Sequence, residues 1–181
     1  MRISGKKLKK QAGEANVSVA DLANVIDRTG LSGDRAETAV RNWMSGRDHP
    51  RCKASDIERI AERLGCSIAN IATFTSSVNH TRGSTRKARL VADLVRGRAV
   101  DDALNVLKFS TKRAAVNVKK ALSAAIADAE QADADVTALY VSESHVNEGK
   151  VIKRFRPKDR GRAHAILKQT SHITISVEER A

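Results

Sequence analysis

Six lysines and arginines stand within the ten positions from Lys153 to Arg162, and their side chains could bind phosphate. Arginine can donate two parallel hydrogen bonds to phosphate oxygens, and lysine binds them as a point charge. So many charges cannot be buried against their own protein, because each unpaired charge is costly to desolvate. Pro157 and Gly161 lie among the cations and predict a turn there. The stretch therefore predicts a basic tip that contacts a polyanion.

Strand patterns on both sides of this stretch predict the element that carries it. Ile173, Ile175 and Val177 alternate with polar residues, which predicts a strand with one buried face. Leu139 and Val141 begin a similar pattern after residue 135. We therefore expect a long β-hairpin over about 136–177. At ~3.3 Å per residue its outgoing arm could reach ~60 Å, whereas the radius of gyration of a 100-residue domain is ~13 Å. The tip should protrude.

The composition favours a nucleic-acid ligand. The chain has 181 residues, a formal net charge of +12 and a pI near 10.2, which argues only weakly for an anionic membrane surface. Aromatic residues make up 3% of the chain, so contact through phosphates and groove shape is favoured over base stacking. No apolar run is long enough to cross a bilayer, and no hydrophobic stretch follows the basic N-terminus. We expect a cytoplasmic protein with no membrane partner.

The sequence contains no recognisable catalytic or metal-binding motif. Cys52 and Cys66 lack CxxC spacing, and His49 has no further ligands near it that would complete a zinc site. The two thiols are expected to be small and buried. The motifs HExxH, GxGxxG, the P-loop and the Ser-His-Asp pattern are missing. We therefore expect no metal, no cofactor and no enzymatic activity, which disfavours a nuclease or RNA-modifying enzyme.

A polar, turn-rich segment over 73–83 predicts a linker between two domains, at 1–75 and 76–181. The first carries +4 and the second +8, counting Lys/Arg against Asp/Glu as 13 − 9 and 20 − 12. In the second, helices are expected after Ser84, near Asp101 and from Ser110 onward. The first of these should bury a stripe of Leu90, Val91, Leu94 and Val95. The long third helix should bury Ala115, Val118, Leu122, Ala125, Ile126 and Ala129.

The first domain is expected to be a small all-α domain. Ser18 is a plausible N-cap, with Asp21 three residues later, and Gly65 should end the helix that follows Ser55. The segments VSVADLANVI, AETAVRNWMSGR and IERIAERLG together resemble the repressor-type helix-turn-helix family, over roughly 5–72. The resemblance implies a nucleic-acid face on the second helix of the motif, at Arg35, Glu37, Thr38, Arg41 and Asn42. Two interpretations of this domain stay open. It is either a small helical bundle whose exposed face is simply solvated, or the DNA-reading unit of a transcription regulator.

The second domain resembles the bacterial large-subunit ribosomal protein twenty-two family over about 78–179. The resemblance is carried by STRKARLVADLVRGRAVDDAL, KRAAVNVKKALSAAIADAE and above all KRFRPKDRGRAHAILKQTSHITISV. It implies an α+β fold, with three helices on a small antiparallel sheet and a long protruding β-hairpin. It also implies a structural role in the large ribosomal subunit, with 23S rRNA and neighbouring large-subunit ribosomal proteins as partners. In this family the hairpin tip lines the nascent-peptide exit tunnel, which makes the nascent peptide a further partner.

The resemblance also assigns roles to individual residues. The implied tunnel-lining tip comprises Arg156, Pro157, Lys158, Asp159, Arg160 and Gly161. The implied rRNA-binding cations are Arg82, Arg86, Lys87, Arg89, Lys112, Arg113, Lys119, Lys120, Lys150, Lys153, Arg154, Arg162 and Lys168. Asp159 departs from the family pattern, because it places a negative charge in a tip that is usually basic. Ala165 and Gln169 stand where cations are common.

Overall fold

The computed structural model describes residues 1–180, and the chain forms two compact units. The first contains residues 1–74, 128–136 and 178–180, and the second contains residues 75–127 and 137–177. Helices and antiparallel strands occur together, so the expected mixed α+β class is confirmed.

The first unit consists mainly of short helices. Its elements are β1 (Arg2–Ile3), α1 (Gly5–Glu14), α2 (Val19–Asn24), α3 (Asp34–Met44), α4 (Ala54–Leu64) and the 3-10 turn η1 (Ile68–Asn70). Ser18 caps α2 in a reciprocal capping box with Asp21, because each side chain bonds to the other residue's backbone N–H. Gly65 ends α4 in the left-handed conformation. Both helix boundaries agree with the sequence prediction.

The core of the first unit forms around α3. Its residues Ala36, Ala39, Val40 and Trp43 are buried, as their helical spacing predicted. Trp43 is 1% exposed, yet its indole N–H is satisfied, since Nε1 donates a 2.6 Å hydrogen bond to the carbonyl oxygen of Pro50. The helix therefore holds the loop that follows it. Helix α2 also packs against α3.

The expected linker over 73–83 is wrong, because this segment is the strand β2 (Ala72–Arg82). The expected domain boundary after residue 75 falls inside it. β1 pairs with its first residues, with Arg2 opposite Thr73. The hydroxyl groups that suggested a turn instead bond across to β6 (Thr170–Glu179). Thr75 Oγ1 lies 3.0 Å from Ser176 Oγ, and Thr81 Oγ1 donates a 2.9 Å bond to the Ser171 carbonyl oxygen.

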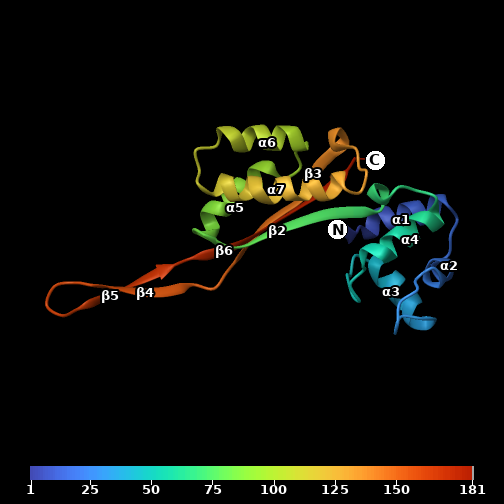
Figure 1. Cartoon of the computed structure of the whole chain (residues 1–181), viewed down its shortest axis with the longest axis horizontal. Helices are drawn as coiled ribbons and strands as arrows, with labels where there is room; N and C mark the ends of the chain where they lie inside the picture. The colour runs from blue at the N-terminus through green and yellow to red at the C-terminus, as the bar shows by residue number, and fades with distance from the viewer. Residues whose placement is uncertain (181) are drawn as a thin grey trace. The chain divides into compact units, whose positions relative to one another are not determined.

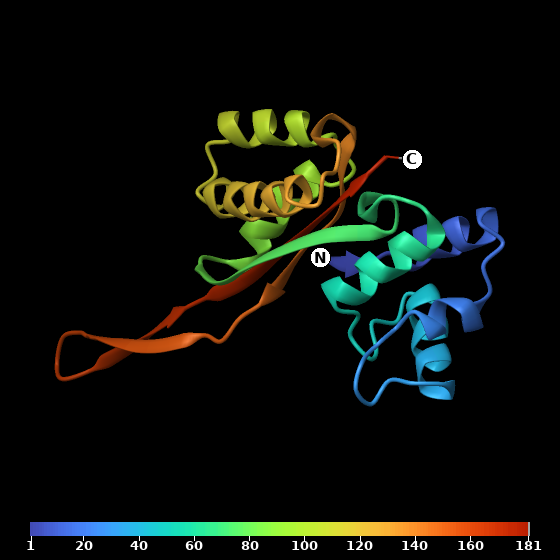
Figure 2. The same ribbon diagram turned by 45° about the vertical axis from the view of Figure 1, so that its right-hand side comes forward.

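The second unit packs three helices on an antiparallel sheet. Its helices are α5 (Thr85–Val95), α6 (Val100–Phe109) and α7 (Ala114–Glu130), followed by the 3-10 turn η2 (Val136–Ala138). Its strands are β2, β3 (Leu139–Glu148), β4 (Ile152–Pro157), β5 (Ala163–Lys168) and β6. The strands β2, β6 and β3 lie in that order in one sheet. Figures 1 and 2 both show α5, α6 and α7 on the same side of this sheet.

The core of this unit is aliphatic. All six residues of the stripe predicted for α7 are buried, and opposite them the sheet buries Leu139, Val141, Ile173, Ile175 and Val177. The stripe predicted for α5 is wrong in part, because Leu90 is 54% and Leu94 is 41% exposed. Ala88 and Ala92 are buried together with Val91 and Val95. The small alanines let the helix approach its neighbours closely, and the leucines are turned outward.

The predicted hairpin over 136–177 consists of two parts. β3 and β6 belong to the sheet that packs under the helices, whereas β4 and β5 form a separate two-stranded ladder. The break lies at residues 149–151, between β3 and β4. In Figure 1 the β4–β5 ladder extends away from α5, α6 and α7. Only residues 152–168 are therefore the free arm.

Candidate nucleic-acid interface

The β4–β5 ladder has two chemically different faces. Directly opposed residues of an antiparallel pair share a face, and successive residues alternate. One face carries the pairs Ile152–Lys168, Arg154–Ile166 and Arg156–His164, and we call it the basic face. The other carries Lys153–Leu167, Phe155–Ala165 and Pro157–Ala163, and we call it the apolar face. Lys153 is the one charged residue among the six of the apolar face, whereas the basic face carries three lysines and arginines.

Both faces of the ladder are open to solvent. Phe155 is 75% and Leu167 is 61% exposed on the apolar face. The three cations of the basic face, Arg154, Arg156 and Lys168, form no ion pair with any of residues 1–180. Among residues 1–180, the Arg154 guanidinium bonds only within its own strand, to the Lys153 carbonyl oxygen at 2.8 Å. The basic face therefore presents donors that an external anion can use.

The tip of the ladder is a five-residue loop over 158–162. The Lys158 N–H donates a 2.8 Å bond to the Arg162 carbonyl oxygen, and the Arg162 N–H donates a 3.2 Å bond to the Asp159 carbonyl oxygen. Arg160 and Gly161 both have positive φ, at 54° and 70°. Glycine takes this conformation without steric cost, whereas arginine does so less readily. All five residues of this loop are exposed.

The root of the ladder is tightly held. Thr170, the first residue of β6, is 3% exposed, and its hydroxyl donates a 2.8 Å bond to the Lys150 carbonyl oxygen. The Gly149 N–H donates a 2.9 Å bond to the Thr170 carbonyl oxygen. A Cβ added to Gly149 would lie 2.4 Å from Thr170 Oγ1, so a larger residue does not fit there without a shift. These contacts fix the point at which the free arm leaves the sheet.

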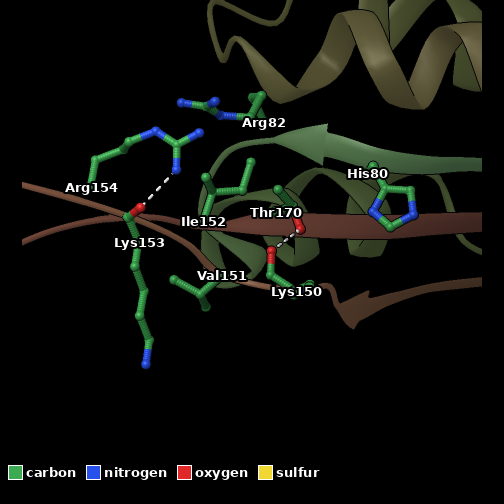
Figure 3. A pocket seen from close by; sticks show the side chains of 8 residues that line it. All are labelled: His80, Arg82, Lys150, Val151, Ile152, Lys153, Arg154 and Thr170. Atoms are coloured by element: carbon green, nitrogen blue, oxygen red, sulfur yellow. Dashed lines mark hydrogen bonds between the residues drawn. The ribbon is translucent and has the colours of Figure 1, made fainter.

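An open groove of about 780 Å³ lies at this root. Figure 3 shows the residues that line it, which come from the end of β2, the bend at 149–151, β4 and the start of β6. They are His80, Arg82, Lys150, Val151, Ile152, Lys153, Arg154 and Thr170. Four of the eight are lysine or arginine and none is acidic. The groove therefore combines positive charge with a small apolar surface.

The cations expected on the body of the unit are exposed and come from three places. Arg86 and Lys87 lie in the first turn of α5, Lys112 and Arg113 precede α7, and Lys119 and Lys120 lie within α7. Figures 1 and 2 show the N-terminal ends of α5 and α7 at the end of the body from which the ladder leaves. Helix N-termini attract anions, which strengthens this basic end.

Arg89 has a different surrounding from the other predicted cations. Its Nε donates a 3.2 Å hydrogen bond to the Val146 carbonyl oxygen, and so connects α5 to β3. Arg96, which the sequence did not single out, bonds to the Ser144 carbonyl oxygen and lies 2.9 Å from Asp93. Both arginines thus stabilise the body in addition to any contact with a ligand.

Sequence reasoning missed four residues of the groove. His80 falls in the segment taken for a linker, and Val151, Ile152 and Thr170 carry no motif. His80 has a positive φ of 56°, and its ring packs edge-on against His172 with 4.6 Å between centroids. Only the pairing of β2 with β6 brings His80 to the root of the ladder. The alternation of residues within β2 was the one feature of the sequence that could have predicted this strand.

The five residues predicted for the N-terminal nucleic-acid face lie on α3 with their side chains at least partly exposed. Arg41 forms a 2.9 Å ion pair with Glu37, and the Thr38 hydroxyl donates a 2.8 Å bond to the Asp34 carbonyl oxygen. Asn42 Nδ2 donates a 2.9 Å bond to the His49 carbonyl oxygen. Arg35 is exposed. α2 and α3 are separated by nine residues, 25–33, which is longer than the usual turn of such motifs.

The two cysteines are free, and their surroundings suit inert thiols. Cys52 is 4% exposed, and burial raises the pKa of its thiol to about 12, helped by the nearby Asp56 and Asp48 carboxylates. Burial also raises the pKa of the half-buried Cys66 thiol. A high pKa keeps a thiol protonated and poorly nucleophilic.

Helices long and apolar enough to cross a bilayer are absent from residues 1–180. Residues 76–178 match the family model described as ribosomal protein L22p/L17e. The match covers more than half of the 181 residues, and it includes β3, most of β2 and β6, the three helices, the ladder and its tip. The chain therefore belongs to the ribosomal protein L22p/L17e family, whose members are structural proteins of the large ribosomal subunit and not enzymes.

Proposed function

We propose that this chain binds 23S rRNA through the basic face of the β4–β5 ladder and the cations at the adjoining end of the body. The observation that carries the proposal is the set of unpaired cations on an exposed two-stranded arm. Such an arm repels itself in isolation, whereas RNA phosphates neutralise each charge and release counterions. Binding of this kind supports assembly of the subunit, because the arm can connect RNA segments that are distant from the body.

The second part of the proposal concerns the tip. Residues 156–161 line the nascent-peptide exit tunnel, with neighbouring ribosomal proteins and the nascent peptide as further partners. The support is the distance of the tip from the body together with the exposure of every residue from 153 to 165. Asp159 forms no ion pair with any described residue, so its carboxylate remains available to a passing basic side chain.

Sedimentation of ribosomal subunits tests the proposal directly. The full chain should migrate with the large subunit on a sucrose gradient and remain bound in high salt. Cross-linkers placed at residue 159 should capture the nascent chain in translating ribosomes. Recovery of the chain only in the free-protein fractions would contradict rRNA binding. Cross-links from residue 159 to rRNA alone, in intact translating ribosomes, would contradict the tunnel assignment.

A further inference from the structure

The groove at the root of the ladder has the composition of a nucleotide-binding site. Ligand pockets of small molecules typically measure ~300–1,000 Å³, and this groove measures about 780 Å³. Four of its eight residues are cations, and none of them forms an ion pair with a described residue. Val151 and Ile152 are the aliphatic residues among the eight. A ligand that fits must be anionic at one end and flat or apolar at the other.

The walls of the groove are held in place by the molecule itself. The Thr170 hydroxyl bonds to the Lys150 carbonyl oxygen at 2.8 Å, and the Gly149 N–H bonds to the Thr170 carbonyl oxygen at 2.9 Å. The His80 ring is held edge-on by His172, at an interplanar angle of 76°. Because these parts are already ordered, a ligand loses little binding energy to ordering them.

The side chains around the groove point in two directions. Figure 3 shows Arg82, Ile152 and Arg154 on the same side of the ladder, whereas the side chains of Lys153 and Val151 point to the opposite side. This agrees with the register, which places Ile152 and Arg154 on the basic face and Lys153 on the apolar face. Arg82 and Arg154 can therefore approach one anion together, and Lys153 cannot join them.

We propose that this groove holds a single unstacked rRNA nucleotide, with its phosphate at Arg82 and Arg154 and its base on Ile152 beside the His80 ring. The proposal rests on the rRNA binding proposed above and adds the kind of RNA feature that is recognised here. Bases that leave the stack are bound by histidine and arginine planes and by apolar side chains. A continuous duplex offers phosphates but no free base to occupy the apolar surface. An acidic peptide could satisfy the arginines, and the test separates it from RNA.

The occupant can be identified by cross-linking from the groove. Ile152 is replaced by the photo-cross-linking residue p-benzoylphenylalanine in the full chain, and large subunits that contain the variant are irradiated. We expect a cross-link to one rRNA nucleotide, mapped by the stop of reverse transcription. Cross-linking to a ribosomal protein, to a run of duplex positions, or to nothing would overturn the proposal while the chain still sediments with the subunit.

Matched charge variants then test the roles of the arginines. Arg82→Gln and Arg154→Gln should each raise the chemical reactivity of the cross-linked nucleotide, on the order of tenfold for one lost charge-assisted contact. Lys108→Gln removes one positive charge at the end of α6, outside the groove, and should leave that reactivity unchanged. Equal effects of all three variants would show that only general charge matters and would overturn the site. Failure of the unaltered chain to enter subunits would instead overturn the proposed rRNA binding itself.

Discussion

The hydroxyl of Thr170 donates a 2.8 Å hydrogen bond to the carbonyl oxygen of Lys150, and so ties the start of β6 to the bend before β4. Thr170→Val keeps the shape of the side chain and removes this donor. We expect the free energy of unfolding to fall by about 1 kcal/mol, because a partly buried carbonyl loses its partner. The amides of β4 should also exchange faster with deuterium. Thr174→Val on the same strand is the control, and an equal loss there would contradict a special role for Thr170.

Gly149 packs against Thr170 so closely that a methyl group does not fit. Its added Cβ would lie 2.4 Å from Thr170 Oγ1 and 3.0 Å from His172 Nε2. Gly149→Ala should therefore destabilise the fold by about 1–3 kcal/mol, as overpacked sites do. Gly13→Ala is the matched control, because nothing lies within 4 Å of its added Cβ and alanine favours the helix.

A double-mutant cycle checks the cause of this clash. If the Thr170 hydroxyl is the main obstacle, Gly149→Ala should cost less in a Thr170→Ala background than in the unaltered chain. Thermal denaturation of the four proteins gives the coupling energy. Strict additivity would place the strain elsewhere, for example at the His172 ring.

The two faces of the ladder should differ in their salt dependence. If Arg154 and Arg156 each bind a phosphate as proposed, Arg154→Gln and Arg156→Gln should each lower the slope of log affinity against log salt by about 0.7–0.9. Leu167→Gln lies on the apolar face and removes no charge, so it should leave the slope unchanged. Filter binding of the full chain to 23S rRNA over a range of salt concentrations gives these slopes. Equal slopes for all variants would contradict the assignment of the basic face.

Cys52 should resist alkylation in the folded protein. Burial raises the pKa of its thiol to about 12, whereas an unperturbed thiol titrates near 9.0. At pH 8 the partly exposed Cys66 should react first, and Cys52 should react at the rate of unfolding, as measured by mass spectrometry of labelled peptides.

The same shift in the pKa of Cys52 makes stability depend on pH. The folded state keeps the proton up to about pH 12, while the unfolded state releases it near 9.0. The protonated Cys52 thiol therefore makes its full contribution to the free energy of unfolding below pH 9, and this contribution is lost as the pH rises towards 12. Cys52→Ala should abolish this alkaline loss, and a variant that retains it in full would show that another group is responsible.

The exposed face of α3 stays a prediction. Arg35 and Arg41 are exposed, and Glu37 is the ionic partner of Arg41. We expect the double substitution Arg35→Gln and Arg41→Gln to lower the affinity of the full chain for nucleic acid without unfolding it. Arg63→Gln, an exposed arginine at the end of α4, is the control in a fluorescence anisotropy assay. If the double variant and the Arg63→Gln control bound nucleic acid with equal affinity, α3 would present an ordinary solvated surface.

The sequence was informative where one pattern dominated. The buried stripe of α7, the Ser18 cap and the Gly65 stop followed from spacing and residue type alone. The strand β2 was missed because its threonines and serines also suit turns, and only pairing with β6 distinguishes the two. Leu90 and Leu94 were predicted to be buried because leucine is strongly hydrophobic. In the structure both are exposed, since the close helix contact requires small residues at the buried positions. The groove could not be predicted, since its residues meet only through tertiary pairing.

The strict alternation along β4 makes the length of this strand as important as its composition. Side chains change sides at every residue, so one residue inserted before Lys153 would carry Phe155 to the side that Arg154 now occupies. The guanidinium groups of Arg154 and Arg156 would then point where the aromatic ring was, although no residue had been lost. Evolution can therefore exchange individual side chains on this arm far more freely than it can add or delete a single position.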